Sequence, residues 1–247
     1  MGIDMIAEKI SKHILDRTLV IVLAHPNDDN KTHILNECLR GITFPKLLCS
    51  NHVTTKETQD LCDWSLYIKE NPILMYEDFG KYDMMLSRWH TNENGERVTL
   101  HHKFDNAYAV SDMIKKGLGF AKYLKKDLIH IVNYDFTITD EIIFENTMEL
   151  IDNELVVYTC PPHIFNHPAC SSAFFSGKIK IMESFFDQWY NADGYYWYKH
   201  HGLFLEEKIY NFMKMISVKM KEYTLDDLGK RCPIGRHAIV ADFVYDE

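Results

Sequence analysis

The sequence lacks long apolar runs, paired cysteine motifs and a secretory leader. Its apolar run at residues 19–24 has six members, whereas a membrane-spanning helix needs about 20. None of the six cysteines stands in a C-x-x-C pair or at zinc-ligand spacing, so we expect reduced structural thiols. No charged stretch followed by an apolar core opens the sequence. These absences predict a protein without a transmembrane segment that works in the cytoplasm, or in the host cytoplasm if it is viral.

An excess of positive charge is also missing. The 27 Lys and Arg residues are outnumbered by 36 Asp and Glu residues, which gives a net charge of −9. Such a surface repels a phosphate backbone, so we expect no nucleic-acid partner. Hydrophobic residues at 46% and charged residues at 26% are typical of a globular chain, which excludes disordered and fibrous classes. Because no repeat or Pro/Gly/Ser-rich linker divides the sequence, we predict one domain over residues 1–247.

Short apolar runs alternate along the chain with segments of helical periodicity. This alternation predicts an α/β fold, in which a mostly parallel sheet is flanked by helices on both faces. An Asn-Gly turn predicts a hairpin or an exposed insertion over residues 88–103. The expected strands are residues 18–24, 46–50, 64–68, 128–132 and 155–159, and the expected helices are residues 3–16, 31–40, 55–62, 106–124, 141–151, 179–190 and 203–223.

One predicted strand ends in two oxygen-bearing side chains. Asn133 and Asp135 follow the apolar run 128–132, and ligands of open parallel sheets gather at the carboxyl ends of strands. In extended backbone, residues two apart point to the same side, so the pair could hold a hard divalent cation together with a diphosphate. Asn and Asp are equally typical of a plain turn at a strand exit.

The region around this pair resembles a known family. The run from Asp127 to Asp135, behind the predicted helix, is similar to the D-x-D region of GT-A nucleotide-sugar glycosyltransferases, especially small bacterial and viral ones. Residues 47–52, followed by residues 60–64 and 69–72, resemble a second segment of that family. Residues 172–177 are similar to its small-residue segment that lines the sugar site. Together the matches span about residues 18–215.

The resemblance implies a single-domain, Rossmann-like GT-A fold, with a nucleotide-binding half at about 18–130 and a sugar and acceptor half at about 131–247. It implies transfer of a hexose or deoxyhexose from a nucleoside-diphosphate sugar to a glycan or glycolipid hydroxyl, as in polysaccharide biosynthesis, with inversion and with help from Mn²⁺ or Mg²⁺. The family usually carries an acid at both ends of D-x-D, and Asn133 departs from this. A neutral amide is a poorer cation ligand, so we expect weak metal binding without nucleotide.

By the same resemblance, several residues are candidates for the donor site. The strand exits 25–27 and 50–52 should approach the base and ribose, and the start of the helix at 106 should approach the ribose or a phosphate. Turns, a helix N-cap and solvated lysines explain the same residues without a ligand. The candidates for nucleotide-sugar binding are His25, Ser50, His52, Asp63, Asn106, Ser111, Asn133, Asp135, Ser176 and Lys178, and those for the metal are Asp135, Asn133 and His201.

Aromatic residues are concentrated late in the chain. Six of them fall within residues 189–198, where sugar rings could stack on their faces, so Tyr196 and Trp197 are candidates for acceptor binding. Core packing or a contact between subunits is an equal alternative, and an oligomer is possible.

The acid pair Glu206-Glu207 resembles the one that many inverting GT-A enzymes carry at this point. An inverting transfer needs a carboxylate that takes the proton of the acceptor hydroxyl. Helical periodicity over 203–223 puts Glu206 on the side of the apolar residues Ile209 and Met213, so we predict Glu206 as the base. Glu207 is the alternative base, because enzymes of this kind often use the second acid. First-turn acids that complement the helix dipole are the alternative. A metal-independent or retaining transferase, or a silent nucleotide- or sugar-binding protein, would fit the same fold.

Overall fold

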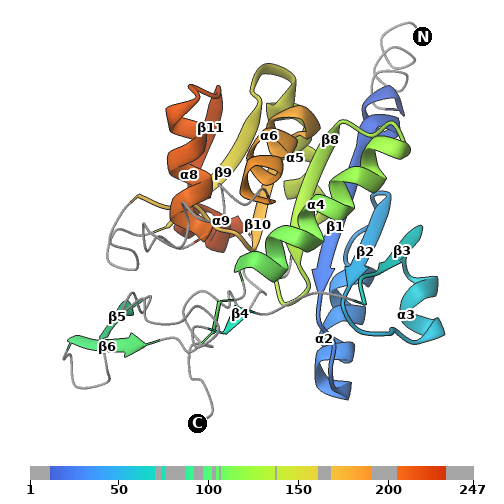
Figure 1. The fold of residues 1–247 in the computed structure, drawn as a ribbon. Helices are drawn as coiled ribbons and strands as arrows, with labels where there is room; N and C mark the ends of the chain where they lie inside the picture. The colour runs from blue at the N-terminus through green and yellow to red at the C-terminus, as the bar shows by residue number, and fades with distance from the viewer. Residues whose placement is uncertain are drawn as a thin grey trace, which may run out of the picture.

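The computed structural model describes residues 12–69, 74–75, 87–91, 97–101, 104–105, 107–136, 138–160, 168–190 and 205–231 (Figure 1). Its main feature is a seven-stranded sheet with the order β11-β9-β10-β8-β1-β2-β3. Every strand of this sheet runs in the same direction except β10, which is antiparallel to both β8 and β9. The strands are β1 (Thr18–Ala24), β2 (Lys46–Ser50), β3 (Trp64–Tyr67), β8 (Leu128–Asn133), β9 (Leu155–Thr159), β10 (Phe174–Lys178) and β11 (Met220–Thr224).

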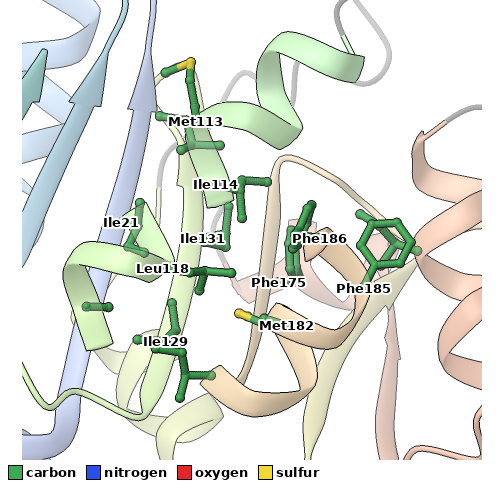
Figure 2. Close-up of a cluster of buried hydrophobic side chains, with 14 of the residues drawn as sticks. Ile21, Met113, Ile114, Leu118, Ile129, Ile131, Phe175, Met182, Phe185 and Phe186 are labelled. Atoms are coloured by element: carbon green, nitrogen blue, oxygen red, sulfur yellow. The ribbon is translucent and has the colours of Figure 1, made fainter. Parts of the chain in front are cut away.

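Helices cover both faces of this sheet, which confirms the predicted fold class. On one face, α4, α6 and α8 pack on a core that includes Ile21, Ile131 and Phe175 (Figure 2). On the other face, α2, α5 and α9 pack on a core that includes Val22 and Val132. Because both faces are covered, all seven residues of β1 are buried. The helices are α2 (Asp29–Arg40), α3 (Lys56–Asp60), α4 (Ala107–Tyr123), α5 (Asp140–Asp152), α6 (Ile179–Tyr190), α8 (Leu205–Met215) and α9 (Leu225–Arg231).

Helix α4 lies unusually close to the sheet. A Cβ atom at Gly117 would lie 3.0 Å from Ile21 Cγ2 and 3.2 Å from Cys49 Sγ, so glycine permits this approach. The helix ends next to the start of β8, where the Asp127 N–H donates to the carbonyl of Arg17, the residue before β1. The N-terminus of α4 therefore lies at the opposite edge, where the parallel strands end (Figure 1).

Two short antiparallel pairs lie outside the main sheet. Strand β5 (Ser87–Thr91) pairs with β6 (Arg97–His101), which confirms the predicted hairpin, and β4 (Leu74–Met75) pairs with β7 (Phe104–Asp105). Residues 12–17 are helical, and the rest of the predicted helix 3–16 lies outside the described residues. Within the described part of the chain, no helix combines the length and apolar character that crossing a membrane requires.

The long helix predicted over 203–223 is wrong. Helix α8 ends at Met215, Ser217 adopts a left-handed φ of 56°, and residues 220–224 form the strand β11. The Val218 N–H donates to the carbonyl of Met213 and thereby closes the end of the helix. Parallel pairing of β11 with β9 outweighs the helical spacing of the apolar residues in this segment.

A buried polar network lies between the sheet and α5. His130 in β8 contacts Ser176 Oγ through Nδ1 at 2.7 Å and Thr147 Oγ1 through Nε2 at 2.9 Å. Asn146 Nδ2 donates to Ser176 Oγ at 2.9 Å, and the Tyr158 hydroxyl donates to Asn146 Oδ1 at 2.9 Å. The Thr147 hydroxyl donates to a backbone carbonyl, so it accepts from His130 Nε2–H, which leaves Nδ1 to accept from Ser176. Both ring nitrogens of the neutral imidazole are therefore hydrogen-bonded. Burial lowers the pKa of His130 to about 3.

Candidate functional site

The strand order creates a switch point between β1 and β8. From β1 the chain continues to β2 on one side, and it later returns through α4 to β8 on the other side. Ligands of open α/β sheets bind in the crevice at the carboxyl ends of such neighbouring strands. Residues 25–27 and 134–136 follow β1 and β8 at this point. Because β10 is antiparallel, residues 172–173 before it lie at the same edge.

Asn133 and Asp135 do not share the extended backbone that the sequence predicted. Asn133 ends β8, and its position in the strand puts it on the side of Ile131, which faces α4. Tyr134 and Asp135 form a turn, closed by a 2.9 Å hydrogen bond from the Phe136 N–H to the Asn133 carbonyl. The turn ends the alternation of side chains along β8. Residues two apart point to the same side only where the backbone is extended.

The carboxylate of Asp135 lies near α2. Burial, and next the charge of Asp135, raise the pKa of Cys38 in α2 to about 12. Burial and the charges of Asp135 and Asp28 also raise the pKa of Tyr134. Joint binding of a cation by Asn133 and Asp135 stays a prediction.

The described residues do not form a complete cation site. No three His, Cys, Asp or Glu side chains are grouped to hold a metal ion in the described ranges, and His201 lies outside them. The strand exit offers one carboxylate and one amide, whereas Mg²⁺ and Ca²⁺ take about six to eight oxygen ligands. Oxygens of water or of a diphosphate would have to complete the ligand shell of a cation here.

The exit of β1 contains an aromatic contact and a lysine. The rings of His25 and Tyr134 meet edge to face, with centroids 5.3 Å apart. Partial burial lowers the pKa of His25, and the charges of Lys31 and His52 lower it further, so the imidazole is mainly neutral at pH 7. Lys31 Nζ donates to Asn27 Oδ1 at 2.8 Å. His25 therefore offers a hydrogen bond at this exit, while Lys31 offers a positive charge.

The exit of β2 borders a cavity of about 250 Å³. The Ser50 hydroxyl donates to the His52 carbonyl at 2.8 Å and accepts from its N–H at 3.1 Å, which fixes the turn. Among the described residues that line the cavity there is no Asp, Glu, Lys or Arg, so it suits an uncharged group. The lining residues are Leu48, Ser50, His52, Val53, Thr54, Gln59, Ser65, Leu66 and Tyr67.

Three predicted donor-site residues lie elsewhere. Asp63 precedes β3 at the amino edge of the sheet, where its carboxylate accepts from the Lys46 N–H at 2.8 Å. Lys178 pairs with Leu128, the first residue of β8, so the antiparallel direction of β10 carries it to that same edge. Ser176 is buried in the network with His130 and has no exposed surface. These positions correct the predictions for Asp63, Lys178 and Ser176.

The acid pair at the start of α8 has the opposite burial from the one predicted. Glu207 is 2% exposed, whereas Glu206 is only partly buried. Ile209 and Met213 are buried as predicted, but Leu205 and Lys208 are buried as well, so the buried face of α8 is wider than the apolar stripe and includes Glu207. Glu206 Oε1 accepts from the Ser172 hydroxyl at 2.8 Å, and the neighbouring Ala173 carbonyl accepts from the Asn133 N–H at 2.8 Å. The predicted base is therefore held beside the exit of β8.

Two buried polar atoms toward the carboxyl edge of the sheet have no hydrogen-bond partner in the described part of the chain. They are Ser111 Oγ, on a side chain that was predicted to bind the donor, and Asn51 Oδ1. Sequence reasoning named the exit 50–52 but missed the Asn51 side chain, and it also missed Ser172. The alternation of side chains along β2 could have identified Asn51, because this residue follows Leu47 and Cys49 on the face that α4 covers.

Four predicted site residues lie outside the described residues. They are Asn106, Tyr196, Trp197 and His201. Their roles in donor, acceptor and metal binding stay predictions.

Comparisons with known proteins give likenesses in structure and none in sequence. No family model and no curated protein matches the chain. Among solved structures, the chain is similar to a "putative nucleotide-diphospho-sugar transferase" from Desulfovibrio desulfuricans G20, with 7% sequence identity, 91% of each chain covered and a TM-score of 0.44. At this TM-score the likeness carries no weight for activity, so the site rests on the contacts described above.

Proposed function

We propose that the protein is a glycosyltransferase that moves a sugar from a nucleoside-diphosphate sugar to a hydroxyl of a glycan or glycolipid. The observation that carries this proposal is the contact of Ser172 with the Glu206 carboxylate beside Asn133, at the sheet edge where β1 and β8 diverge. A carboxylate oriented at such a switch point suits proton transfer to or from a bound substrate.

In this proposal the donor extends along the carboxyl edge of the sheet. Its nucleoside binds near the exits of β1 and β2, where His25 and the cavity beside Ser50 and His52 offer uncharged polar groups. Its diphosphate binds near the exit of β8, where Asp135 and the Asn133 amide, which leave the strand on different sides, would have to meet at the diphosphate to hold a Mn²⁺ or Mg²⁺ ion. That ion would offset the charge of the leaving group when bound.

Glu206 is the proposed base for an inverting transfer. The acceptor oxygen forms a bond to the anomeric carbon while Glu206 takes its proton, and the bond from that carbon to the diphosphate oxygen breaks with its electron pair. The Ser172 hydroxyl donates to one oxygen of Glu206 and leaves the other for the acceptor. Tyr196 and Trp197 are proposed to stack against the acceptor sugar.

The test is a panel of UDP- and GDP-sugars with Mn²⁺ and mixed glycan acceptors, with calorimetric binding and product formation both measured. Asp135→Ala should weaken binding of the diphosphate donor and abolish turnover. Glu206→Gln should keep donor binding and lower kcat by about 100-fold or more. Asp152→Asn, an exposed change at the far end of α5, is the matched control and should retain full activity.

Four results would redirect this proposal. Full activity of Asp135→Ala would refute its role. Turnover that survives EDTA would indicate a metal-independent transferase, and a product with the donor's anomeric configuration would make Glu206 structural. Tight binding of a nucleotide sugar without transfer or hydrolysis would indicate a silent binding protein.

A further inference from the structure

Helix α4 contains a glycine that the packing of the described residues does not explain. Gly117 lies against Ile21 and Cys49 of the sheet, which accounts for its missing side chain. Gly119 is exposed, and a Cβ atom there would meet no atom of the described residues within 4 Å. A glycine inside a helix lowers the stability of that helix relative to alanine. Gly119 therefore indicates that another molecule approaches α4 closely at this point.

The side chains around Gly119 form a basic and aromatic rim. On a helix the neighbours of a residue are three and four positions away. Around Gly119 they are Lys115, Lys116, Lys122 and Tyr123. Tyr123 is 80% exposed, so the rim presents a large aromatic ring beside three lysines. Four side chains around a missing one make a hole that can receive a side chain from a facing helix.

Lys122 is the most exposed lysine of this rim. Its side chain is 69% exposed, and its ammonium group pairs with Glu183 of α6 at 3.0 Å. A pair this exposed adds little to stability and is screened by salt. Because an ammonium group has three N–H donors, Lys122 can bind a second carboxylate and keep the first. The rim therefore suits a partner that is apolar at its centre and acidic around it.

The outward face of α5 has this character. Phe144, Met148 and Ile151 recur at helical spacing and are between 40% and 51% exposed, so they form an apolar stripe. Glu141 and Asp152 are exposed on the same face. The whole helix contains five acids and no Lys, Arg or His. The stripe on α5 is thus opposite in charge to the rim around Gly119.

The rim and the stripe cannot meet within one molecule. Helix α4 contributes Ile114 and Leu118 to the core on one face of the sheet, whereas α5 contributes Ile142 and Ile143 to the core on the other face (Figure 1). The sheet therefore separates the two surfaces. A contact between them joins two molecules head to tail, because each molecule uses α4 toward one neighbour and α5 toward another.

We propose that the protein self-associates through these surfaces, with α5 of one copy seated on α4 of the next. Met148, in the middle of the stripe, enters the hole at Gly119, and the acids of α5 face the lysines of the rim. One pair of short helices buries less than the roughly 1,200–2,000 Å² of a stable interface, so the association depends on concentration. This inference goes beyond the proposed function, because it needs no ligand at the carboxyl edge.

Sedimentation velocity at increasing protein concentration tests the proposal. The average mass of the wild type should rise past that of a dimer, because head-to-tail contacts do not stop at two copies. Added salt should weaken the association. Lys122→Glu and Met148→Lys should each weaken it by about tenfold or more, because each puts like charges face to face. The matched controls Lys56→Glu in α3 and Met215→Lys at the end of α8 make the same changes at other exposed positions and should associate as the wild type does.

A mixture of the two blocked variants separates this arrangement from a symmetric one. Lys122→Glu keeps an intact α5, and Met148→Lys keeps an intact α4. An equal mixture should therefore form a dimer and nothing larger, although each variant alone stays monomeric at the same concentration. A contact that used one surface twice would not give this result.

Gly119→Ala separates a binding role from a structural one. Alanine is the better helix former, and its methyl group would lie in open space in the monomer, so the thermal unfolding midpoint should rise. The same methyl group narrows the hole, so self-association should weaken by about tenfold. Unchanged association of Gly119→Ala would refute the close approach at this residue.

Four outcomes overturn the inference and leave the proposed function untouched. They are a wild type that stays monomeric at every concentration, a wild type that stops at a dimer, control variants that lose association as the blocked variants do, and a mixture of blocked variants that stays monomeric. Binding of the monomer to phosphatidylserine vesicles, lost in Lys122→Glu, would assign the rim to a lipid surface instead.

Discussion

Two groups of buried polar side chains differ in how completely they are paired. Beneath β8, His130, Ser176 and Asn146 form a network in which each buried polar atom has a partner. Toward the carboxyl edge, Asn51 after β2 and Ser111 in α4 each leave one buried atom unpaired among the residues that the structure describes. The first group stabilises the fold, and the second is available to a ligand. Buried polarity alone therefore does not identify a site, whereas its pairing does.

The largest expected effect is from His130→Ala. This change opens a cavity and leaves Thr147 and Ser176 without their ring partner, so it should lower the free energy of unfolding by about 3–5 kcal/mol. Urea denaturation followed by circular dichroism measures the loss. A change below about 1 kcal/mol would remove the distinction between the two groups.

The second-largest expected effect is a loss of stability in acid. The pKa of His130 is about 3 in the folded protein, below its ordinary value of 6.5. Between these two pH values the unfolded chain binds a proton that the folded chain does not. The free energy of unfolding should therefore fall as the pH drops from 6.5 toward 3, by up to about 1.4 kcal/mol per pH unit from this residue.

Denaturation curves at several pH values between 4 and 8 measure this dependence. The variant His130→Gln cannot titrate and should show a shallower fall. The exposed residue His33 in α2 offers the matched control, because His33→Gln should keep the full acid sensitivity. Equal slopes for wild type and His130→Gln would contradict the prediction.

Tyr158→Phe should have a smaller effect. It removes the hydroxyl that donates to Asn146 Oδ1 and leaves that oxygen buried without a partner, while the ring stays packed against Phe174. We expect a loss of about 1–3 kcal/mol in the free energy of unfolding. Chemical denaturation checks it, and an unchanged midpoint would mean that Asn146 finds another donor.

The smallest effect on stability is expected from Ser172→Ala at the sheet edge. Its hydroxyl contacts a partly exposed carboxylate, so the free energy of unfolding should change by less than about 0.5 kcal/mol. If Glu206 is the base, turnover should still fall, because the carboxylate loses its orientation. A stability loss as large as that of Tyr158→Phe would assign Ser172 to the structural group.

The sequence predicts the central strands of this fold better than the strands β10 and β11. Strands such as β1 and β8 are covered on both faces, so their apolar runs are unambiguous. Strand β10 was missed because Ser176 is polar and Gly177 has no side chain, so the segment lacks the apolar run of a buried strand. The partners of Ser176, His130 and Asn146, come from distant segments of the chain. Strand β11 was missed because its apolar residues continue the helical spacing of α8.

The candidate site was predictable where it depended on strand exits alone. Exits 25–27 and 50–52 follow from the boundaries of β1 and β2. The position of Lys178 was not predictable, because it requires the direction of β10. The direction of the Asp135 side chain was not predictable either, because a turn replaces extended backbone after Asn133.

The place of β10 in the sheet has a consequence for biosynthesis. Strand β9 has only β10 and β11 as neighbours, and the ribosome produces both of them after β9. Strands β1, β2, β3 and β8 can assemble while the chain is still growing, but β9 must wait for β10 to line up along β8. The Ser172 contact with Glu206 joins the segment before β10 to the start of α8, so the candidate active site is completed only after α8 has been made.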